Sequence, residues 1–356
     1  MKSYLEQDID YLVSNLDILS ELKDKSILIT GATGLLGSFM VKVLCEYNKR
    51  NNASVRIIAL VRNIKKAESI FRPYLDDDSL SFIAGDVSEK ITTAKNIDYI
   101  IHGASVTSSK MFVEKPVETI QTLIDGTKSM LNLAHEKNAV NIVFMSSLEV
   151  YGVPDRENYQ VSEDYVGYID FTNIRSCYSE GKRMAECLCN SFAKEYGIKV
   201  STVRLSQTFG PGVAYEDDRV FAQFARSVIN HENISLNTEG RTYRNYCYLR
   251  DAVAGIFYGL IKGENCEAYN IANKDTGISI ADMAQLVCSS KKLGNGQIEV
   301  IFNHPEEISQ FGYNPEMKIE LVTDKLEKLG WKAEVGLEDM YFRMIEDMRE
   351  SMRRVN

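Results

Sequence analysis

Two residues four positions apart, Tyr178 and Lys182, are the pair in this chain best suited to move a proton. On a helix, residues at this spacing share a face. An ammonium group beside a phenol stabilises the phenolate and lowers the phenol's pKa from about 10. Ser147 ends an apolar, strand-like run, so its hydroxyl is expected at the sheet edge, where it can hold the reacting oxygen. The three residues together predict general acid/base catalysis.

A glycine-rich segment, Gly31-Ala32-Thr33-Gly34-Leu35-Leu36-Gly37, could bind the pyrophosphate of a dinucleotide. It follows the apolar run 26–30 and leads into a predicted helix over 35–48. Its three glycines allow a tight turn, a close approach to the phosphates and close packing of helix on strand. The free N–H groups at the start of the helix favour an anion. We therefore expect Gly31, Gly34, Leu35, Leu36 and Gly37 to contact a dinucleotide cofactor; a glycine-rich turn without a ligand is the alternative.

Three further strand ends bear on the cofactor. The second strand ends in Arg62 rather than in a carboxylate, and a guanidinium pairs with a ribose 2′-phosphate. NADP(H) is therefore favoured over NAD(H), with a solvated strand-end role for Arg62 as the alternative. Asp86 and Val87 follow the third strand, where an Asp can accept from the adenine amino group. Ala104 follows the fourth strand, where a small residue leaves room for the cofactor.

The elements that must position these residues alternate along the first half of the chain. Apolar strand-like runs interleaved with helical stretches predict a parallel sheet covered on both faces. Strands are expected at 26–30, 55–61, 81–84, 97–101, 140–145 and 199–205, and helices at 35–48, 64–72, 113–137 and 176–196.

The chain divides into three predicted parts. Residues 1–24 form a helical extension, with apolar residues at helical spacing over 4–22. Residues 25–205 form a doubly wound α/β, or Rossmann, cofactor domain. Residues 206–356 form a smaller C-terminal α/β substrate lobe, which could be interleaved with the first domain. Its expected elements are helices near 218–230, 250–262, 279–290 and 337–353 and strands near 234–237 and 243–249.

Composition excludes several classes of function. A net charge of −9 and a pI near 5.2 argue against broad contact with a nucleic-acid backbone. No stretch reads as a secretory signal or a membrane span, so we expect a cytoplasmic protein. Seven cysteines without a CxxC pair fit reduced thiols, and the four histidines show no metal-ligand spacing.

The motifs GATGLLG, GDV, HGAS, MSSLEVYG and CYSEGK, with the C-terminal Leu329-Gly330-Trp331, resemble those of the extended short-chain dehydrogenase/reductases that remodel nucleotide-activated sugars. The resemblance covers about residues 24–345. It implies that Ser147, Tyr178 and Lys182 act together: the cofactor removes a hydride from a sugar carbon, usually C4, while Tyr178 takes the hydroxyl proton. It also implies that Tyr178 and Lys182 contact the cofactor.

The resemblance also indicates which type of reaction the enzyme catalyses. The 4,6-dehydratases carry an Asp-Glu pair where this chain has Leu148-Glu149, and leucine cannot protonate a leaving hydroxyl. Glu149 matches a glutamate of the dehydratases and of the nucleotide-glucuronate decarboxylases, and segment 175–183 looks closest to the decarboxylases. A surface carboxylate is the alternative for Glu149. Epimerisation or decarboxylation is therefore expected, with reduction of a nucleotide-linked keto sugar by NADPH, favoured by Arg62, as one alternative. The second alternative is a non-catalytic protein that senses the cofactor, but the presence of the proton-transfer residues argues against it.

The second lobe is expected, by resemblance, to bind the nucleotide diphosphate of the substrate. Arg244 looks like the arginine that clamps the diphosphate, because a guanidinium matches phosphate oxygens in bidentate fashion. Gln207, Arg219 and Val220 are further candidates, although the family usually has Asn where Gln207 stands. Surface salt bridges are the alternative for the arginines. A homodimer formed through the helices at 113–137 and 176–196 is also expected by resemblance.

Overall fold

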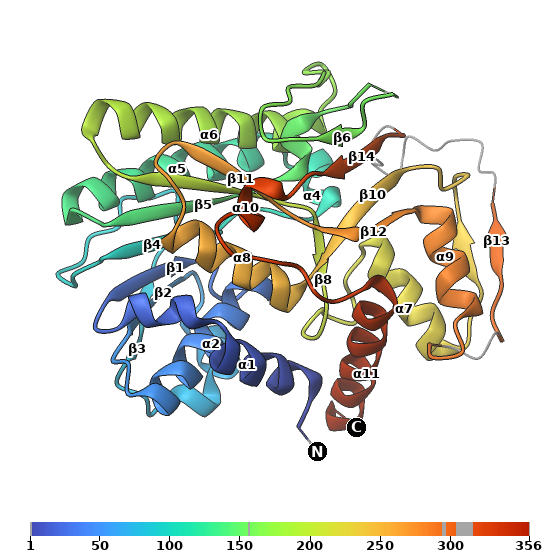
Figure 1. Cartoon of the computed structure of the whole chain (residues 1–356), viewed down its shortest axis with the longest axis horizontal. Helices are drawn as coiled ribbons and strands as arrows, with labels where there is room; N and C mark the ends of the chain where they lie inside the picture. The colour runs from blue at the N-terminus through green and yellow to red at the C-terminus, as the bar shows by residue number, and fades with distance from the viewer. Residues whose placement is uncertain (1, 156, 294–296, 304–315, 356) are drawn as a thin grey trace.

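The computed structural model describes residues 2–155, 157–293, 297–303 and 316–355. Two lobes are built around two sheets (Figure 1). We call the part around the larger, seven-stranded sheet the large lobe and the part around the five-stranded sheet the small lobe. The large lobe is the predicted doubly wound α/β fold.

The large sheet is wholly parallel, with the spatial order β3-β2-β1-β4-β5-β7-β11. Strand order reverses between β1 and β4, and ligands of such sheets bind at the carboxyl ends of the strands beside this reversal. The segments after β1 and β4, which hold the glycine motif and Ala104, therefore lie side by side. The strands are β1 Ser26–Thr30, β2 Arg56–Val61, β3 Leu80–Ala84, β4 Tyr99–His102, β5 Asn141–Ser147, β7 Val200–Leu205 and β11 Glu267–Ile271.

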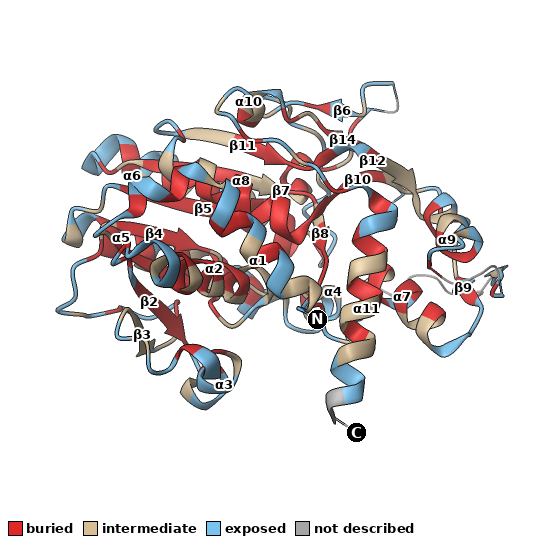
Figure 2. Cartoon of the chain, turned by 60° about the horizontal axis from the view of Figure 1, so that its bottom comes forward, coloured by how far each residue is buried: buried red, intermediate tan, exposed pale blue. Residues whose placement is uncertain are grey.

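Helices cover both faces of this sheet, because alternate apolar side chains of each strand point to opposite faces. Ile27 and Ile29 of β1 pack in one core with helices α2 and α8, whereas Leu28 packs in another with α5 and α6. The central strands β1 and β4 are accordingly buried along their whole length, whereas β3 at one edge of the sheet is half-buried (Figure 2). The helices of this lobe are α1 Tyr4–Asn15, α2 Leu35–Asn51, α3 Ile64–Ile70, α4 Ser109–Glu114, α5 Pro116–Lys137, α6 Ser176–Tyr196, α8 Leu249–Ile261 and α10 Asp324–Glu327.

Two predicted helices are divided in the structure. The helix expected over 4–22 is α1 followed by the 3₁₀ helix η1 (Asp17–Leu22). The helix expected over 113–137 is two helices, α4 and α5, that meet at Pro116. Proline disfavours helical backbone in the residue before it and lacks an N–H, so it starts the new helix instead of continuing the old one. Two shorter 3₁₀ helices are η2 Arg72–Tyr74 and η3 Leu148–Tyr151.

The small lobe has a mixed sheet with the order β12-β10-β14-β6, and β8 pairs with β10. Its own apolar core contains side chains of helices α7, α9 and α11. Strands β9 and β13 form a separate pair. The elements are β6 Gln160–Val161, β8 Gln207–Phe209, β9 Ile234–Leu236, β10 Tyr243–Tyr248, β12 Asn273–Ser279, β13 Val300–Phe302, β14 Lys318–Leu321, α7 Val220–Asn230, α9 Ile280–Ser289 and α11 Leu337–Val355.

The chain passes between the lobes more than once. Strand β6, from the first half of the sequence, joins the small sheet, whereas α8 and β11 return to the large sheet from the second half. The predicted division after residue 205 stays a prediction, and the lobes exchange segments across it. Within the described part of the chain, no helix combines the length and the apolar character needed to cross a bilayer.

Candidate active site

Tyr178 and Lys182 lie on one face of α6, near its start and next to the carboxyl end of β5. Both side chains are buried, with 8% and 3% of their surface exposed. The Lys182 Nζ donates a 2.7 Å hydrogen bond to the carbonyl oxygen of Met145 in β5. It also lies 5.8 Å from the centre of the Tyr178 ring. The predicted helical pair therefore sits at the predicted sheet edge.

The pKa of Tyr178 is shifted opposite to our expectation. Burial raises this pKa well above its ordinary value, and the negative charge of Glu149 raises it further. A hydrogen bond with Ser147 and the nearby guanidinium groups of Arg175 and Arg219 act in the other direction. Desolvation, which disfavours the phenolate, is the larger effect. Burial also lowers the pKa of Lys182 to about 8.

Glu149 is the carboxylate of this site, and it is held as an anion. Arg175 donates to both of its oxygens, from Nη1 to Oε2 at 2.8 Å and from Nη2 to Oε1 at 3.1 Å. Ser179 Oγ donates to Oε2 at 3.1 Å. Burial alone would raise the pKa of Glu149, but these hydrogen bonds and the charges of Arg175 and Arg244 outweigh it, so the pKa lies below its ordinary value. Glu149 is therefore not a surface carboxylate.

A buried phenylalanine, Phe112, stacks on Tyr178. The rings of Phe112, on α4, and Tyr178 stack with centroids 4.4 Å apart and planes 13° apart. The guanidinium of Arg175 lies 5.4 Å from the centre of the Phe112 ring. The ring of Phe112 thus packs against Tyr178 and lies next to Arg175, the arginine that holds Glu149.

Arg244 reaches the same site from strand β10 of the small lobe. Only 8% of this residue is exposed, and its Nε is buried without a hydrogen-bond partner. The guanidinium makes no hydrogen bond or ion pair with any residue that the structure describes, yet its charge lowers the pKa of Glu149. A buried, unpaired cation is costly unless a ligand neutralises it. Arg244 is therefore poised to bind an anion.

The other predicted substrate residues, Gln207, Arg219 and Val220, differ in their surroundings. Arg219 is already paired with Asp217, with its closest contact at 2.6 Å between Nη2 and Oδ2. Its charge still reaches Tyr178. Val220 is the first residue of α7 and is half-buried, and Gln207 begins β8 beside Tyr246 of β10. Their contact with a substrate stays a prediction.

The glycine motif has the shape that a dinucleotide requires. Gly31 has a φ of +69°, and a side chain there would press on the backbone of Gly103 and Ala104 at 3.0 Å. A Cβ on Gly37 would lie 2.2 Å from the carbonyl oxygen of Gly31. Gly34 is the N-cap of α2 and brings no side chain over the first N–H groups of that helix. These residues fit a pyrophosphate at the helix N-terminus, with Leu35 and Leu36 in the first turn.

A buried polar contact fixes the ends of β1 and β4 beside this motif. Thr30 Oγ1 accepts from the N–H groups of Gly103 at 3.1 Å and Ala104 at 2.9 Å, so its own proton goes to His102 Nδ1 at 3.0 Å. His102 Nε2 is then the protonated nitrogen, and it donates to Thr127 of α5 at 3.2 Å. Burial and the charge of Lys182 lower the pKa of His102 to about 3, so the ring stays neutral.

Arg62 and Asp86 are neighbours at the carboxyl ends of β2 and β3. The hydrogen bonds from Ser88 lower the pKa of Asp86 most, burial opposes them, and the charge of the exposed Arg62 makes a smaller lowering contribution. A carboxylate therefore lies near the tip of β2 although none ends that strand. Val87 packs in the core against Gly126, and its contact with a cofactor stays a prediction.

Four residues of this site were not predicted from the sequence. Arg175 and Ser179 flank Tyr178 within one turn of helix, so helical spacing next to the predicted tyrosine could have indicated them. Phe112 and Asp217 lie far from the catalytic motif in sequence, and no local pattern distinguishes them from core or surface residues.

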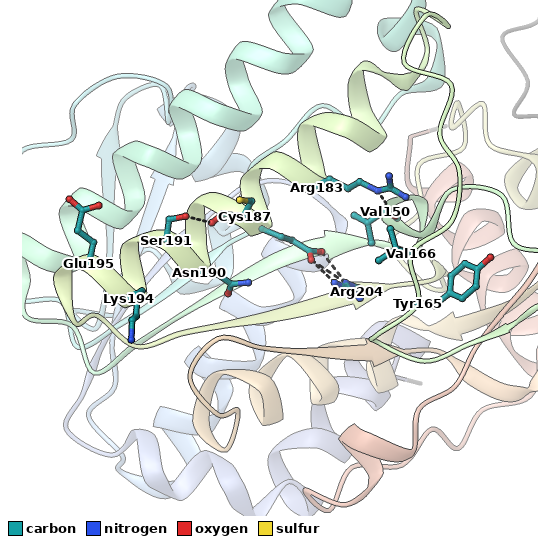
Figure 3. A pocket seen from close by; sticks show the side chains of 11 residues that line it. Val150, Tyr165, Val166, Arg183, Cys187, Asn190, Ser191, Lys194, Glu195 and Arg204 are labelled. Atoms are coloured by element: carbon teal, nitrogen blue, oxygen red, sulfur yellow. Dashed lines mark hydrogen bonds and ion pairs between the residues drawn. The ribbon is translucent and has the colours of Figure 1, made fainter.

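A separate pocket of about 730 Å³ runs along α6 from Arg183 to Glu195, away from these residues (Figure 3). Glu186 and Arg204 are ion-paired at 2.7 Å in its wall. Its lining includes none of Ser147, Tyr178 or Lys182.

Comparison with known proteins agrees with this geometry. The model of the NAD dependent epimerase/dehydratase family matches residues 27–272. UDP-glucuronic acid decarboxylase 3 of Arabidopsis thaliana is 31% identical over 328 residues, which cover 91% of this chain and 89% of that protein. UDP-glucuronic acid decarboxylase 1 of Xenopus tropicalis is 28% identical, over 98% of this chain and 78% of that protein.

Solved structures share the fold at low sequence identity. An epimerase of Methanothermobacter thermautotrophicus superposes with a TM-score of 0.78 at 19% identity, over 97% of each chain. The UDP-glucose 4-epimerase of Thermotoga maritima, solved with UDP-glucose, gives a TM-score of 0.74 at 20% identity, over 92% of this chain and 99% of that one. The predicted doubly wound fold and enzyme class are confirmed. This chain belongs to the NAD dependent epimerase/dehydratase family.

Proposed function

We propose that this enzyme decarboxylates a nucleotide-linked uronic acid through a 4-keto intermediate, without net consumption of its cofactor. The observation that carries the proposal is the buried, ionised Glu149, held by Arg175 and Ser179 next to Tyr178. Simple 4-epimerases need no such group. The decarboxylases among the relatives support the same choice.

The neighbouring residue argues against a dehydratase. Leu148 is buried in an apolar cluster with Val150, Tyr151 and Ile319. It therefore neither carries an acidic proton nor faces a substrate. A step that protonates a leaving hydroxyl has no donor at this position.

Each catalytic side chain has a role that its surroundings support. When bound, NAD(P) would supply the acceptor of a hydride from C4 of the sugar and later return it. Tyr178 takes the proton of the C4 hydroxyl while Ser147 holds that oxygen, and it gives the proton back at the end of the cycle. Lys182 brings a positive charge beside the phenol. The ketone activates the adjacent C–CO₂ bond, so that CO₂ leaves and a proton takes its place at C5.

The small lobe supplies the anion-binding side of the site. Arg244, buried and without a protein partner, binds the diphosphate of the nucleotide. Arg219 keeps its pair with Asp217 and adds positive charge near Tyr178. Gln207 and Val220 border the nucleotide.

NADP(H) is the proposed cofactor, because Arg62 at the tip of β2 can pair with a 2′-phosphate. The nearby Asp86 competes for the same guanidinium, so the preference over NAD(H) is modest. The same arginine supports a second candidate function, the reduction of a nucleotide-linked keto sugar by NADPH.

We also propose that the enzyme is a cytoplasmic homodimer joined through α5 and α6. Large apolar side chains are exposed on these helices and on the adjoining α4, where burial against a second copy would remove them from water. They are Val113, Val117, Ile120 and Met184.

The test incubates the purified enzyme with nucleotide-linked uronic acids and follows CO₂ release together with the absorbance of reduced nicotinamide. Decarboxylation predicts CO₂ without net cofactor consumption, whereas stoichiometric consumption would establish the reductase. Tyr178→Phe keeps the ring packing and is the matched inactive control, with kcat lower by about two to four orders of magnitude.

A further inference from the structure

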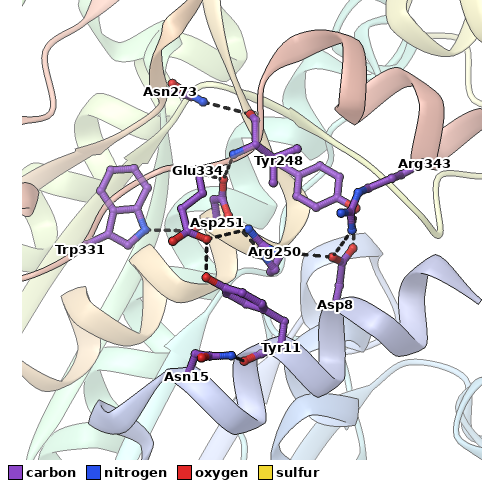
Figure 4. A network of polar contacts seen from close by, with 11 residues as sticks. Asp8, Tyr11, Asn15, Tyr248, Arg250, Asp251, Asn273, Trp331, Glu334 and Arg343 are labelled. Carbon is purple, nitrogen blue, oxygen red and sulfur yellow. Dashed lines mark hydrogen bonds and ion pairs between the residues drawn. The ribbon is translucent and has the colours of Figure 1, made fainter. Parts of the chain in front are cut away.

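Helix α1 precedes the segment matched by the family model, and it lies where the two lobes meet. It packs on α2 and α8 of the large lobe and on α11 of the small lobe. Polar side chains of β10, α8 and α11 converge on its inner face (Figure 4).

The centre of this contact is Asp8, which is 1% exposed. Its carboxylate accepts a hydrogen bond from the hydroxyl of Tyr248, at the end of β10, and one of 3.0 Å from Nη1 of Arg343 in α11. Arg250 of α8 lies 4.0 Å away. One buried carboxylate thus joins α1 to a strand and a helix of the small lobe (Figure 4).

A second contact from α1 strengthens the connection. The Tyr11 hydroxyl donates to Glu334 Oε2 at 2.6 Å, and Arg250 Nη2 donates to the same oxygen at 2.8 Å. The guanidinium of Arg250 also lies 3.8 Å from the centre of the Tyr11 ring. The segment that leads into α11 is therefore tied to α1 as well.

Strand β10 links this contact to the active site. Tyr248, which donates to Asp8, and Arg244, whose positive charge lowers the pKa of Glu149, are on the same strand four residues apart, and both are buried. Their strand pairs with the other small-lobe strands β8, β12 and β14. The position of Arg244 relative to the large lobe therefore depends on where β10 is held.

We infer that Asp8 is a positioning residue, which through Tyr248 holds strand β10 so that Arg244 faces the active site. The inference rests on the proposed role of Arg244 in binding the diphosphate. It assigns to α1 a function in substrate binding besides its packing.

The chain offers a matched control on the same helix. Asp10 pairs with Lys2 of its own segment and with Arg50 of α2, so its ion pairs stay on the large-lobe side. Asp10→Asn removes a carboxylate from α1 without touching β10. Asp8→Asn keeps an acceptor for the Tyr248 hydroxyl but loses the charge, and Tyr248→Phe deletes only the hydroxyl.

The experiment measures the affinity of these full-length variants for uridine diphosphate by titration calorimetry and the hydrogen exchange of residues 243–248. We expect Asp8→Asn, which removes the negative charge that Tyr248 and Arg343 bind, and Tyr248→Phe, which removes the hydroxyl, each to weaken binding about tenfold. We also expect faster exchange in β10, with cofactor affinity unchanged and Asp10→Asn behaving as the parent protein. If Asp8→Asn does not fold, Tyr248→Phe carries the test.

The inference would be overturned if Asp8→Asn and Tyr248→Phe lowered thermal stability but left the diphosphate affinity and the hydrogen exchange of β10 the same as in the parent protein. Arg244→Ala separates this result from a failure of the proposed function. If Arg244→Ala leaves diphosphate binding unchanged, Arg244 does not bind the diphosphate. The inference about Asp8, which rests on that role, then fails as well. If Arg244→Ala weakens binding while Asp8→Asn and Tyr248→Phe do not, only the inference about Asp8 fails.

Discussion

Arg175 holds Glu149 in a bidentate pair, in which two guanidinium nitrogens donate hydrogen bonds of 2.8 and 3.1 Å to the two carboxylate oxygens. Breaking such a buried pair leaves a charge without a partner, so each residue is needed to keep the other in place. The pair lies beside Tyr178, and the guanidinium keeps the carboxylate ionised where burial alone would favour its neutral form.

Replacing Glu149 with Gln separates the two halves of the proposed reaction. The amide keeps the size of the side chain but lacks the charge and the proton-accepting oxygen of the carboxylate, so the half of the reaction that follows hydride transfer, followed as CO₂ release, should slow by about two orders of magnitude or more. Hydride transfer depends on Tyr178, so reduced nicotinamide should still form when substrate is mixed with the variant. Stopped-flow absorbance and CO₂ trapping measure the two steps. Glu180→Gln, on α6 close to Tyr178, is the control, and an equal loss of both steps in Glu149→Gln would assign Glu149 a purely structural role.

Removing the guanidinium of Arg244 should weaken substrate binding. Arg244→Ala loses a charge-assisted contact worth about 2 kcal/mol, so the substrate KM should rise about thirtyfold. Cofactor affinity should not change. Steady-state kinetics check this prediction against Arg241→Ala, because Arg241 is exposed and pairs with Glu239. An unchanged KM in Arg244→Ala would mean that the anion binds elsewhere.

The cofactor preference should depend on Arg62. In the parent enzyme NADP(H) should bind more tightly than NAD(H), and Arg62→Ala should narrow this difference about tenfold, because one phosphate contact is lost. Titration calorimetry with both cofactors gives the answer. Arg56→Ala changes an exposed arginine at the other end of the same strand and should have no effect. Equal affinities in the parent enzyme would refute the proposed preference.

Activity should decline at alkaline pH as Lys182 loses its proton. Burial disfavours its ammonium form and lowers its pKa to about 8, so the charge is present below this pH and is lost above it. The plot of kcat against pH should therefore turn down near pH 8. Lys182→Arg, whose charge persists at all these pH values, should lack this decline even if its overall rate is lower. The same decline in Lys182→Arg would show that another group titrates.

The sequence predicts the parts of the molecule that local patterns determine. Alternating strands and helices predict the parallel sheet and six of its strands, but not β11, and the glycine spacing of residues 31–37 predicts a turn that only glycine fits. The spacing of Tyr178 and Lys182 is likewise a local property of one helix.

Contacts between segments that are distant in the sequence could not be predicted, because no local pattern encodes them. Only the tertiary fold brings some of these residues together. Examples are the ring stack of Phe112 on Tyr178 and the hydrogen bond from Tyr248 to Asp8. The direction of the Tyr178 pKa shift depends on how deeply the ring is buried, and spacing on a helix carries no information on burial by other elements.

The central claim, decarboxylation through a keto intermediate, is tested most directly by the position of solvent hydrogen in the product. We predict that turnover of a nucleotide-linked uronic acid in D₂O gives a product without the carboxylate and with a single deuterium at C5. The C4 hydrogen should be the one that the substrate carried, because the hydride is removed and returned within the site. A product that keeps its carboxylate, or that gains a hydride from added reduced cofactor, would contradict the account.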